Sequence, residues 1–285
     1  MLTLENVSLV YQPNTPFETA ALKDVSLTIQ KGEFLAVIGH TGSGKSTFAQ
    51  LLNGLLTPTS GRVLLEGQDV HQKGFDKKTL RRRVGMVFQY AENQLFEETV
   101  YKDIAFGPKN QGLSEEEISQ RVKYAMERVG LGFALFADKS PFDLSGGQMR
   151  RVAIAGVLAM QPDLLVLDEP AAGLDPMGRQ DMLQMVKGLH EEGRSIVMIT
   201  HSMDDAARYA DRIVVFDHGR AVMQGTVQEV FRDAEKMLSL GLDVPQVYRL
   251  SLEIRKKHPD FPLCLRHEDA LNALKTLLKG GNEPC

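Results

Sequence analysis

The stretch Gly39–Thr47, GHTGSGKST, decides the fold of this chain. It matches the phosphate-loop pattern G-x-x-x-x-G-K-[ST], whose glycines let backbone N–H groups turn inward around phosphate oxygens. An apolar run, Phe34–Ile38, precedes the loop, and a helical run, Ser46–Leu55, follows it. The first turn of that helix adds a partial positive charge that favours an anion. Together these features predict a strand, a phosphate-binding loop and a helix.

We expect every residue of this loop to contact a nucleotide. The residues are Gly39, His40, Thr41, Gly42, Ser43, Gly44, Lys45, Ser46 and Thr47. Lys45 would neutralise the β- and γ-phosphates, and the Ser46 hydroxyl would help to hold Mg²⁺. A glycine-rich turn with a chance lysine is the structural alternative, and the flanking strand and helix argue against it. The motif indicates a nucleoside triphosphate, and leaves open which one is bound and for what purpose.

Two further strands are followed by side chains that suit hydrolysis of such a ligand. The apolar run Leu164–Leu167 ends in Asp168, placed to hold the Mg²⁺ shell, and Glu169, placed to polarise a water molecule for attack on the γ-phosphate. His201 follows the apolar run Ile196–Ile199, and a neighbouring strand of one sheet would bring it to the same edge. It could then donate a hydrogen bond to the γ-phosphate or to the attacking water. The alternatives are an ordinary acidic strand end and a structural histidine.

A second cluster of small residues opens a long helical run, Met149–Met160. The cluster consists of Leu144, Ser145, Gly146, Gly147 and Gln148. Its backbone N–H groups would point at an anion, as the phosphate loop does. Two such helix ends are hard to bring onto one nucleotide within one subunit. We therefore expect two chains to pair head to tail, with each cluster closing on the phosphate loop of the other chain.

Short apolar runs alternate with longer helical patterns, which predicts an α/β fold with a largely parallel sheet. The expected strands are Val25–Ile29, Phe34–Ile38, Val63–Leu65, Val84–Phe88, Leu164–Leu167, Ile196–Ile199 and Ile213–Phe216. Residues from about 90 to 161 break this rhythm with a mostly helical pattern. A capping box at Ser114–Glu117 and a stop at Gly130 bound one of its helices. We expect a helical subdomain inserted into an ATPase domain of residues 1–230.

The pattern changes again towards the end of the chain. Pro245–Lys257 and His267–Leu278 place apolar residues at helical spacing. We expect residues 231–285 to form a short helical appendage. Packing on its own domain and contact with a second subunit are equally compatible with the pattern.

Composition bounds the function classes. The 285 residues carry a formal charge of −4, so a partner built of nucleic acid is not expected. Two cysteines, Cys264 and Cys285, are too few for a disulfide framework and stand in no metal-ligand spacing. The chain opens with an alternating run, Leu2–Val10, where a signal peptide would have a charged and then an apolar region. Its apolar runs are far shorter than the ~20 residues that cross a bilayer. We expect a membrane role only through partners.

Over residues 1 to about 230 the order of these motifs resembles that of ATP-binding-cassette (ABC) ATPases. The resemblance implies a P-loop core of ABC type with an antiparallel β subdomain and an inserted helical subdomain. It adds three roles. Gln89 would sense the γ-phosphate and Mg²⁺ and couple the site to a membrane partner, and Asp175, in the loop that begins at Ala172, would link the two sites of a dimer. Tyr11 would stack on adenine, a contact worth about 1 kcal/mol beyond its area.

A finer resemblance covers nearly the whole chain and points to the energy-coupling factor (ECF) transporter ATPases, in particular the second of their two types. The stretches that carry it are Tyr11–Pro13, Thr15–Glu18, Gly39–Gly42, Phe88–Tyr90, Gln94–Val100 and Gly146–Gly156. The resemblance implies a peripheral subunit at the cytoplasmic face of the cell membrane. It further implies a second ATPase in a heterodimer, a transmembrane T-component docked on a groove at Gln89–Phe106, and several S-components that choose a vitamin or metal ion.

The implied activity is hydrolysis of ATP to ADP and phosphate, coupled to import. Two alternatives remain open on the sequence. One is the homodimeric ATPase of a dedicated cobalt or nickel system, or of another ABC importer. The other is a soluble ABC protein that acts on ribosomes or DNA, which a single cassette without extended heptads disfavours. The transported solute is not encoded here, because the substrate site would lie on another polypeptide.

Overall fold

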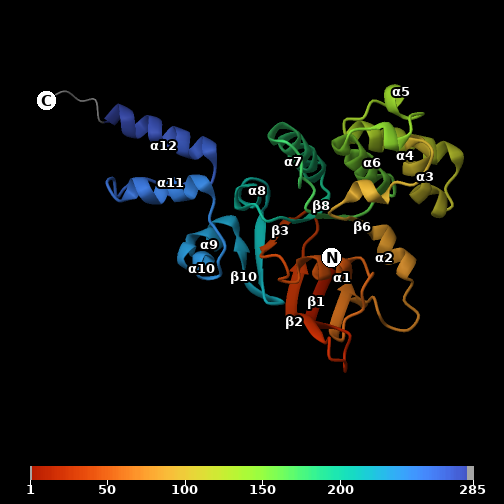
Figure 1. Cartoon of the computed structure of the whole chain (residues 1–285), viewed down its shortest axis with the longest axis horizontal. Coiled ribbons are helices and arrows are strands. Elements are labelled where there is room, and N and C mark those ends of the chain that lie inside the picture. Colours follow the sequence, from red (N-terminus) through yellow and green to blue (C-terminus); the bar gives the residue numbers. More distant parts are fainter. Residues whose placement is uncertain (1, 281–285) are drawn as a thin grey trace.

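The computed structural model describes residues 2–280 and contains two β-sheets with helices around them (Figure 1). Its strands are β1 (Leu2–Tyr11), β2 (Thr19–Ile29), β3 (Phe34–Gly39), β4 (Ser60–Leu65), β5 (Gln68–Asp69), β6 (Val84–Val87), β7 (Leu164–Asp168), β8 (Ser195–Ile199), β9 (Arg212–Asp217) and β10 (Arg220–Thr226). Cys285 and the last part of the predicted appendage, 281–285, lie outside the described residues.

The helices follow the same chain order. The α-helices are α1 (Lys45–Leu52), α2 (Lys77–Arg83), α3 (Val100–Asn110), α4 (Glu115–Arg128), α5 (Phe133–Phe136), α6 (Gly146–Ala159), α7 (Pro176–Glu191), α8 (Met203–Tyr209), α9 (Val227–Arg232), α10 (Ala234–Ser239), α11 (Gln246–Arg255) and α12 (His267–Gly280). Two 3₁₀ helices are η1 (Ala91–Gln94) and η2 (Pro141–Asp143). No helix within residues 2–280 is long and apolar enough to cross a membrane.

The larger sheet has the strand order β10-β9-β3-β8-β7-β6, and its strands β9, β3, β8, β7 and β6 run parallel. Strands β3, β6, β7 and β8 are buried along their whole length, as expected for parallel strands covered on both faces. Alternate side chains of these strands therefore enter two different cores. This confirms the predicted α/β class with a largely parallel sheet.

One face of the large sheet packs against the smaller, antiparallel sheet, whose order is β2-β1-β4-β5. The core between them also contains α1. Leu35 and Val37 of β3 enter this core, and Phe48 of α1 packs on Phe216 of β9 with ring centroids 5.2 Å apart. Strand β1 has the alternating burial that its sequence pattern predicts. The phosphate-loop helix is thus clamped between two sheets.

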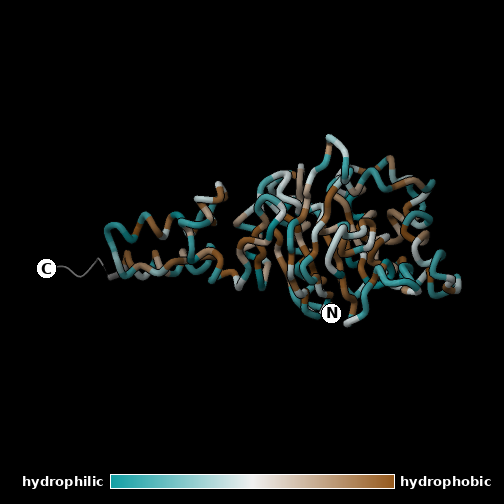
Figure 2. The backbone as a smooth tube through the Cα atoms, turned by 90° about the horizontal axis from the view of Figure 1, so that it is seen from below, coloured by the Kyte–Doolittle hydropathy of each residue, from teal (hydrophilic) through white to brown (hydrophobic). Residues whose placement is uncertain are grey.

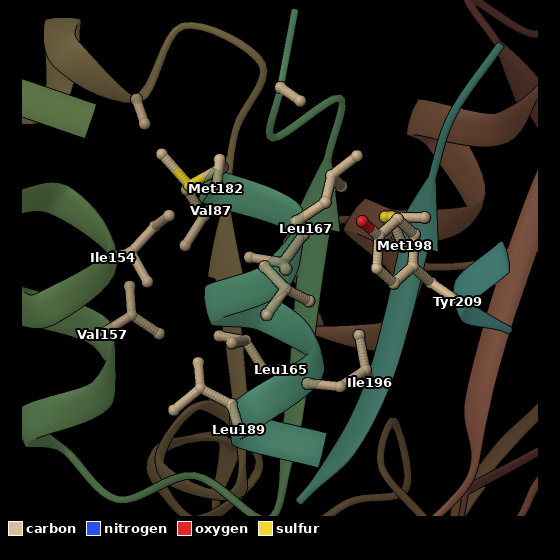
Figure 3. Close-up of a cluster of buried hydrophobic side chains, with 14 of the residues drawn as sticks. Val87, Ile154, Val157, Leu165, Leu167, Met182, Leu189, Ile196, Met198 and Tyr209 are labelled. Carbon is tan, nitrogen blue, oxygen red and sulfur yellow. The ribbon is translucent and has the colours of Figure 1, made fainter. Parts of the chain in front are cut away.

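The other face of the large sheet packs against helices α6 and α7 (Figure 3). Ile154 and Val157 of α6 point towards Val87 and the strand residues Leu165 and Leu167. Helices α3, α4 and α5 lie on the outer side of α6, away from the sheet (Figure 1). The apolar core therefore runs without a break from the sheet into the helical part of the chain.

Local capping chemistry fixes the helices of that part. The predicted capping box is confirmed, because the Glu117 backbone N–H donates to the Ser114 hydroxyl and the Glu117 carboxylate accepts from the Ser114 N–H. Gly130 follows the end of α4 with φ +74°, a conformation that glycine adopts without strain. The predicted start and stop of this helix therefore agree with the structure.

The last helices extend to one side of the sheets and end in the pair α11 and α12 (Figures 1 and 2). Val247, Phe261, Cys264 and Ala270 form a small core between these two helices that is separate from the two large cores. The Gln246 backbone N–H donates to the Asp204 carboxylate at 3.0 Å, and this hydrogen bond joins α11 to α8.

Several expected boundaries were wrong. Strand β6 stops at Val87, and Phe88 is exposed, because the chain turns there away from β7. Strands β5 and β10 were not predicted, since neither has the apolar pattern of a buried strand. The two expected helices at the end of the chain are present, and Leu250 of α11 and Leu271 of α12 are exposed to solvent.

Replacing Phe48 with Ala should lower the free energy of unfolding by about 3–5 kcal/mol, because it opens a cavity between the two sheets. Urea unfolding followed by circular dichroism measures the change. Phe17→Ala is the control, since the Phe17 side chain is 77% exposed and its loss should cost little. Equal losses in the two variants would contradict the proposed clamp on α1.

Candidate nucleotide-binding site

The ends of four parallel strands line one edge of the large sheet. Strand β8 lies between β3 and β7, and β6 follows β7. Ile199 pairs with Val37 on one side and with Asp168 on the other. The phosphate loop, His201, the Asp168–Glu169 pair and Gln89 all follow these strand ends. The sheet therefore brings residues that are up to 162 positions apart in the chain to one edge, between Gly39 and His201.

Glycine is required at specific points of the phosphate loop. Gly42 has φ +79° and Gly44 has φ +105°, conformations that side chains disfavour. A Cβ atom on Gly44 would also lie 2.6 Å from the Ala21 carbonyl oxygen of β2, whereas one on Gly42 would meet nothing within 4 Å. The loop is closed on the protein side and open on the other, as a cradle for a ligand must be.

Lys45 lies buried inside the arc of this loop. Its ammonium Nζ donates to the carbonyl oxygens of Gly39 and His40, both at 2.7 Å. Burial lowers the pKa of Lys45, while the nearby carboxylates of Glu169 and Asp168 act in the opposite direction. The Ser43 hydroxyl is buried and has no hydrogen-bond partner within residues 2–280. A phosphate group would satisfy both the cation and this orphaned hydroxyl.

Asp168, at the end of β7, lies close enough to Lys45 for their charges to interact. Burial raises the pKa of its carboxyl group, and a hydrogen bond from the Ser46 hydroxyl and the charge of Lys45 counteract that rise. Hydroxyl and carboxylate oxygens are the hard ligands that Mg²⁺ prefers. The Ser46–Asp168 pair thus has the donor set of a magnesium site.

Glu169 and His201 form the pair closest to hydrolytic chemistry. The His201 Nδ1 atom lies 2.9 Å from the Glu169 Oε1 atom. The Glu169 side chain is 13% exposed and that of His201 is 67% exposed. The backbone of Glu169 adopts φ +52°, and its N–H donates to the Ile199 carbonyl oxygen at 3.0 Å. A left-handed non-glycine residue held by its neighbours is a recurrent feature of active sites.

The remaining loop contacts are at its rim. The Tyr11 hydroxyl lies 3.2 Å from the Thr47 hydroxyl, so the expected adenine-stacking ring stands beside the loop. Thr41 is exposed next to His40. The His40 Nε2 atom lies 2.8 Å from the Leu240 carbonyl oxygen at the end of α10. The sequence contained no signal for this contact between the phosphate loop and the C-terminal helices.

The second predicted anion-binding cluster, residues 144–148, which we call the signature, lies at the start of α6 and not in the phosphate loop. Ser145 caps α6 in a capping box with Gln148, Gly146 and Gly147 form its first turn, and Leu144 is buried. Helices α6 and α1 pack on opposite faces of the large sheet (Figure 1). No hydrogen bond joins residues 144–148 to residues 39–47 within the described chain. One chain therefore does not bring the two predicted anion sites together.

Two more predicted residues are placed at the periphery. Gln89 is exposed beyond the end of β6. Asp175 caps α7, and its carboxylate accepts from the Gly178 N–H at 2.7 Å. The Asp175 carboxylate therefore has a structural role in this chain.

Sequence reasoning missed Arg150, whose side chain is buried and bonded to residues of two loops. Sequence reasoning expected a groove at Gln89–Phe106 but did not predict the other elements that line it. This groove, of about 750 Å³, is lined by residues of α2, β6, η1, α3 and α6. Phe96 and Phe106, on its wall, are exposed and contact each other edge to face, with centroids 4.9 Å apart.

The family model described as ABC transporter matches residues 22–172. The energy-coupling factor transporter ATP-binding protein EcfA2 of Clostridium perfringens is 55% identical over 257 residues, which cover 90% of this chain and 90% of that protein. The chain belongs to the ATP-binding subunits of ECF transporters. The EcfA2 protein of Caldanaerobacter subterraneus subsp. tengcongensis is 52% identical over 281 residues, or 98% of each chain. This ECF subunit is therefore an ATP-binding ABC ATPase whose hydrolysis is coupled to transport.

Solved structures agree with the fold. CbiO1 of Clostridium perfringens, described as part of the ABC transporter complex CbiONQ, has a TM-score of 0.75 and 38% identity, covering 89% of this chain and 98% of that one. A dimeric ATP-binding cassette bound to ADP and Pi in a post-hydrolysis state has a TM-score of 0.71 and 31% identity, covering 80% and 99%. The ABC-type core is thus confirmed.

Gly44→Ala should weaken ATP binding about tenfold or more, because the new Cβ atom would collide with the Ala21 carbonyl and distort the loop, at a cost above 1.4 kcal/mol. Gly32→Ala is the matched variant, because Gly32 lies outside the loop, has φ +70° and leaves open space around a Cβ atom. Isothermal titration calorimetry with ATP compares the two. An equal loss of affinity for Gly32→Ala would show that ATP binding does not depend on contact of the loop with β2.

Proposed function

We propose that this chain is the ATP-hydrolysing motor of an ECF importer and works at the cytoplasmic face of the cell membrane. The observation that carries the proposal is the sheet edge at which Lys45, His201 and Glu169 stand on neighbouring strand ends, in a chain of this family. Hydrolysis of ATP would power uptake of vitamins or other micronutrients through a T-component. Several S-components would choose the solute.

The hydrolytic step would depend on Glu169 and His201. Glu169 would accept a proton from the water that attacks the γ-phosphate, and His201 would donate a hydrogen bond to the γ-phosphate or to that water. The 2.9 Å contact between the two side chains supports this division, because it orients both towards the same place. Lys45, together with the backbone N–H groups of the loop, would stabilise charge on the transferring group.

Mg²⁺ would be held by Ser46 and Asp168, with Gln89 completing the protein's share. The contact between the Ser46 hydroxyl and the Asp168 carboxylate supports this assignment. One carboxylate with a hydroxyl suits Mg²⁺, which usually takes few protein ligands and keeps phosphate and water oxygens. The bound ion would neutralise phosphate charge and so lower the barrier to displacement.

The catalytic unit would be a dimer. Ser145, Gly146 and Gly147 open α6 away from the phosphate loop, so a second chain is needed to place a signature on the nucleotide. Asp175 would lie at that dimer contact. The dimeric cassette among the similar structures supports this arrangement. We further propose a heterodimer with the other ECF ATPase type.

The helical appendage, residues 231–285, would contribute to the same dimer. Leu250, Leu271 and Leu278 are exposed on α11 and α12, whereas the residues between these helices already form a small core. Apolar side chains left on the outer faces of a helix pair favour contact with a partner.

The groove beside η1 would receive the T-component. The exposed rings of Phe88, Phe96 and Phe106 provide an apolar surface, and Arg81 and Arg82 of α2 add positive charge at its border. The buried Gln94 Nε2 atom on its lining has no hydrogen-bond partner within residues 2–280. A groove with aromatic walls and an unused donor suits an amphipathic helix.

Glu169→Gln should leave ATP binding within about twofold and reduce turnover by 10²–10⁴-fold, the usual contribution of a general base. Calorimetry measures the binding, and phosphate release measures the turnover. Glu191→Gln, at a surface carboxylate that pairs with Lys187, is the control. Normal turnover in Glu169→Gln would overturn the role of Glu169.

Affinity purification of this chain from native membranes in mild detergent tests the partners. Recovery of a second ATPase of similar size, a T-like membrane protein and small integral membrane proteins is expected. Recovery of one dedicated membrane partner and no second ATPase would replace the heterodimer with a homodimer. Recovery of ribosomes, DNA or no membrane protein would contradict the transport role.

The same purification tests the groove. Phe96→Ser should reduce recovery of the T-like protein about tenfold, because about 1.5–3 kcal/mol of apolar burial is lost. Recovery of the second ATPase should not change. Leu135→Ser, on α5 and 70% exposed, is the control for a lost apolar surface residue. Undiminished recovery with Phe96→Ser would remove Phe96 from the contact.

A further inference from the structure

Arg150 is the buried cation of the signature helix. It lies in the second turn of α6, and its side chain is only 6% exposed. A buried charge is costly unless it is paired and its donors are used. The structure meets that requirement with partners from two different loops.

The first partner lies in η1, beside the groove. The Arg150 Nη2 atom lies 3.3 and 3.2 Å from the two carboxylate oxygens of Glu92, and Nε lies 3.4 Å from Oε2. The Glu92 side chain is 25% exposed. Gln94, two residues after Glu92 in η1, lines the groove wall. The Arg150 guanidinium is therefore bonded on one side to η1, the segment that a molecule bound in the groove would contact.

The second partner is the loop that carries Glu169. The Arg150 Nη1 atom donates to the carbonyl oxygens of Pro170, at 3.3 Å, and Ala172, at 2.5 Å. This loop is short and turned, since the Ala172 N–H donates to the Glu169 carbonyl oxygen at 3.1 Å. A shift of the Pro170 or Ala172 carbonyl would therefore move Glu169, which already has the strained φ of +52°.

Only arginine has the geometry for both contacts. Its planar fork presents donors in fixed directions, whereas a lysine ammonium is a single point charge on a flexible stem. At this position lysine could approach Glu92 or the carbonyl oxygens, but would not bridge them in the same plane.

We infer that Arg150 is a positioning residue that holds the Glu169 loop in its catalytic geometry and transmits movement of η1 to that loop. The inference deepens the proposed function and rests on it for the identity of the groove's occupant. Binding in the groove would move Glu92. Because the Arg150 guanidinium contacts Glu92 and the Pro170 and Ala172 carbonyls, it would move those carbonyls as well. The signature helix, which bears Arg150, would move with them.

The test uses the complex purified with its partners, in which this chain is wild type or one of three variants. Arg150→Lys should lower kcat by about tenfold to a hundredfold, as expected for a slightly misplaced catalytic group, with KM for ATP within about threefold. Glu92→Ala leaves the carbonyl contacts in place, so its kcat should fall less. The matched control is Glu192→Ala. Glu192 pairs with Arg128, and its side chain is 32% exposed, close to the 25% of Glu92.

Hydrogen exchange of the backbone amides of residues 169–175 gives a readout that does not depend on activity. Both Arg150→Lys and Glu92→Ala should accelerate exchange in that segment, even though Glu92 lies outside it, in η1. The control Glu192→Ala should leave exchange there unchanged. Unchanged exchange in Glu92→Ala, or a kcat in Arg150→Lys equal to that of the control, would overturn the inference. A wild-type complex that lacks ATPase activity when purified with its partners would instead overturn the proposed function, and the exchange data would still decide the role of Arg150.

Discussion

The parallel pairing of β3, β8, β7 and β6 is the constraint on which the rest of the structure depends. Parallel strands present all their carboxyl ends at one edge, so the loops that follow them meet there whatever their distance in the chain. Ile199 of β8, paired with both Val37 and Asp168, sets the spacing between the phosphate loop and the carboxylates. Such strands need cover on both faces, which the antiparallel sheet and the helices α6 and α7 supply.

The same burial that stabilises the sheet makes its edge electrostatically costly. Burial lowers the pKa of Lys45 and raises that of Asp168, so each charged form is disfavoured by its surroundings and favoured by the other's charge. The orphaned Ser43 hydroxyl and the positive φ of Glu169 add to this cost. Polyanionic nucleotide and a metal ion are the ligands that would relieve it. The site therefore lowers the stability of the free protein, and bound nucleotide would remove that cost.

Helix α6 connects parts of the molecule that serve different contacts. Its first turn carries the signature, its middle carries Arg150, and its apolar side chains pack on β6 and β7. The helix therefore touches the proposed dimer contact at one end and borders the groove through residues such as Gly156 and Met160 at the other. A rigid helix with contacts to both proposed surfaces would give a direct physical route between the nucleotide and the occupant of the groove.

The local motifs were determined by the sequence alone. The phosphate loop, the two acidic residues after Leu164–Leu167 and the capping box at Ser114 depend on neighbouring residues, and the structure contains each where the pattern predicted it. The neighbour order of the strands, the pairing of Glu169 with His201, the contact of His40 with Leu240 and the bridge through Arg150 were decided only by the tertiary structure. These join residues from 20 to 200 positions apart, and no local pattern encodes which distant backbone atom a buried side chain will meet. Phe88 and Leu250 show the same limit, because exposure depends on what packs nearby.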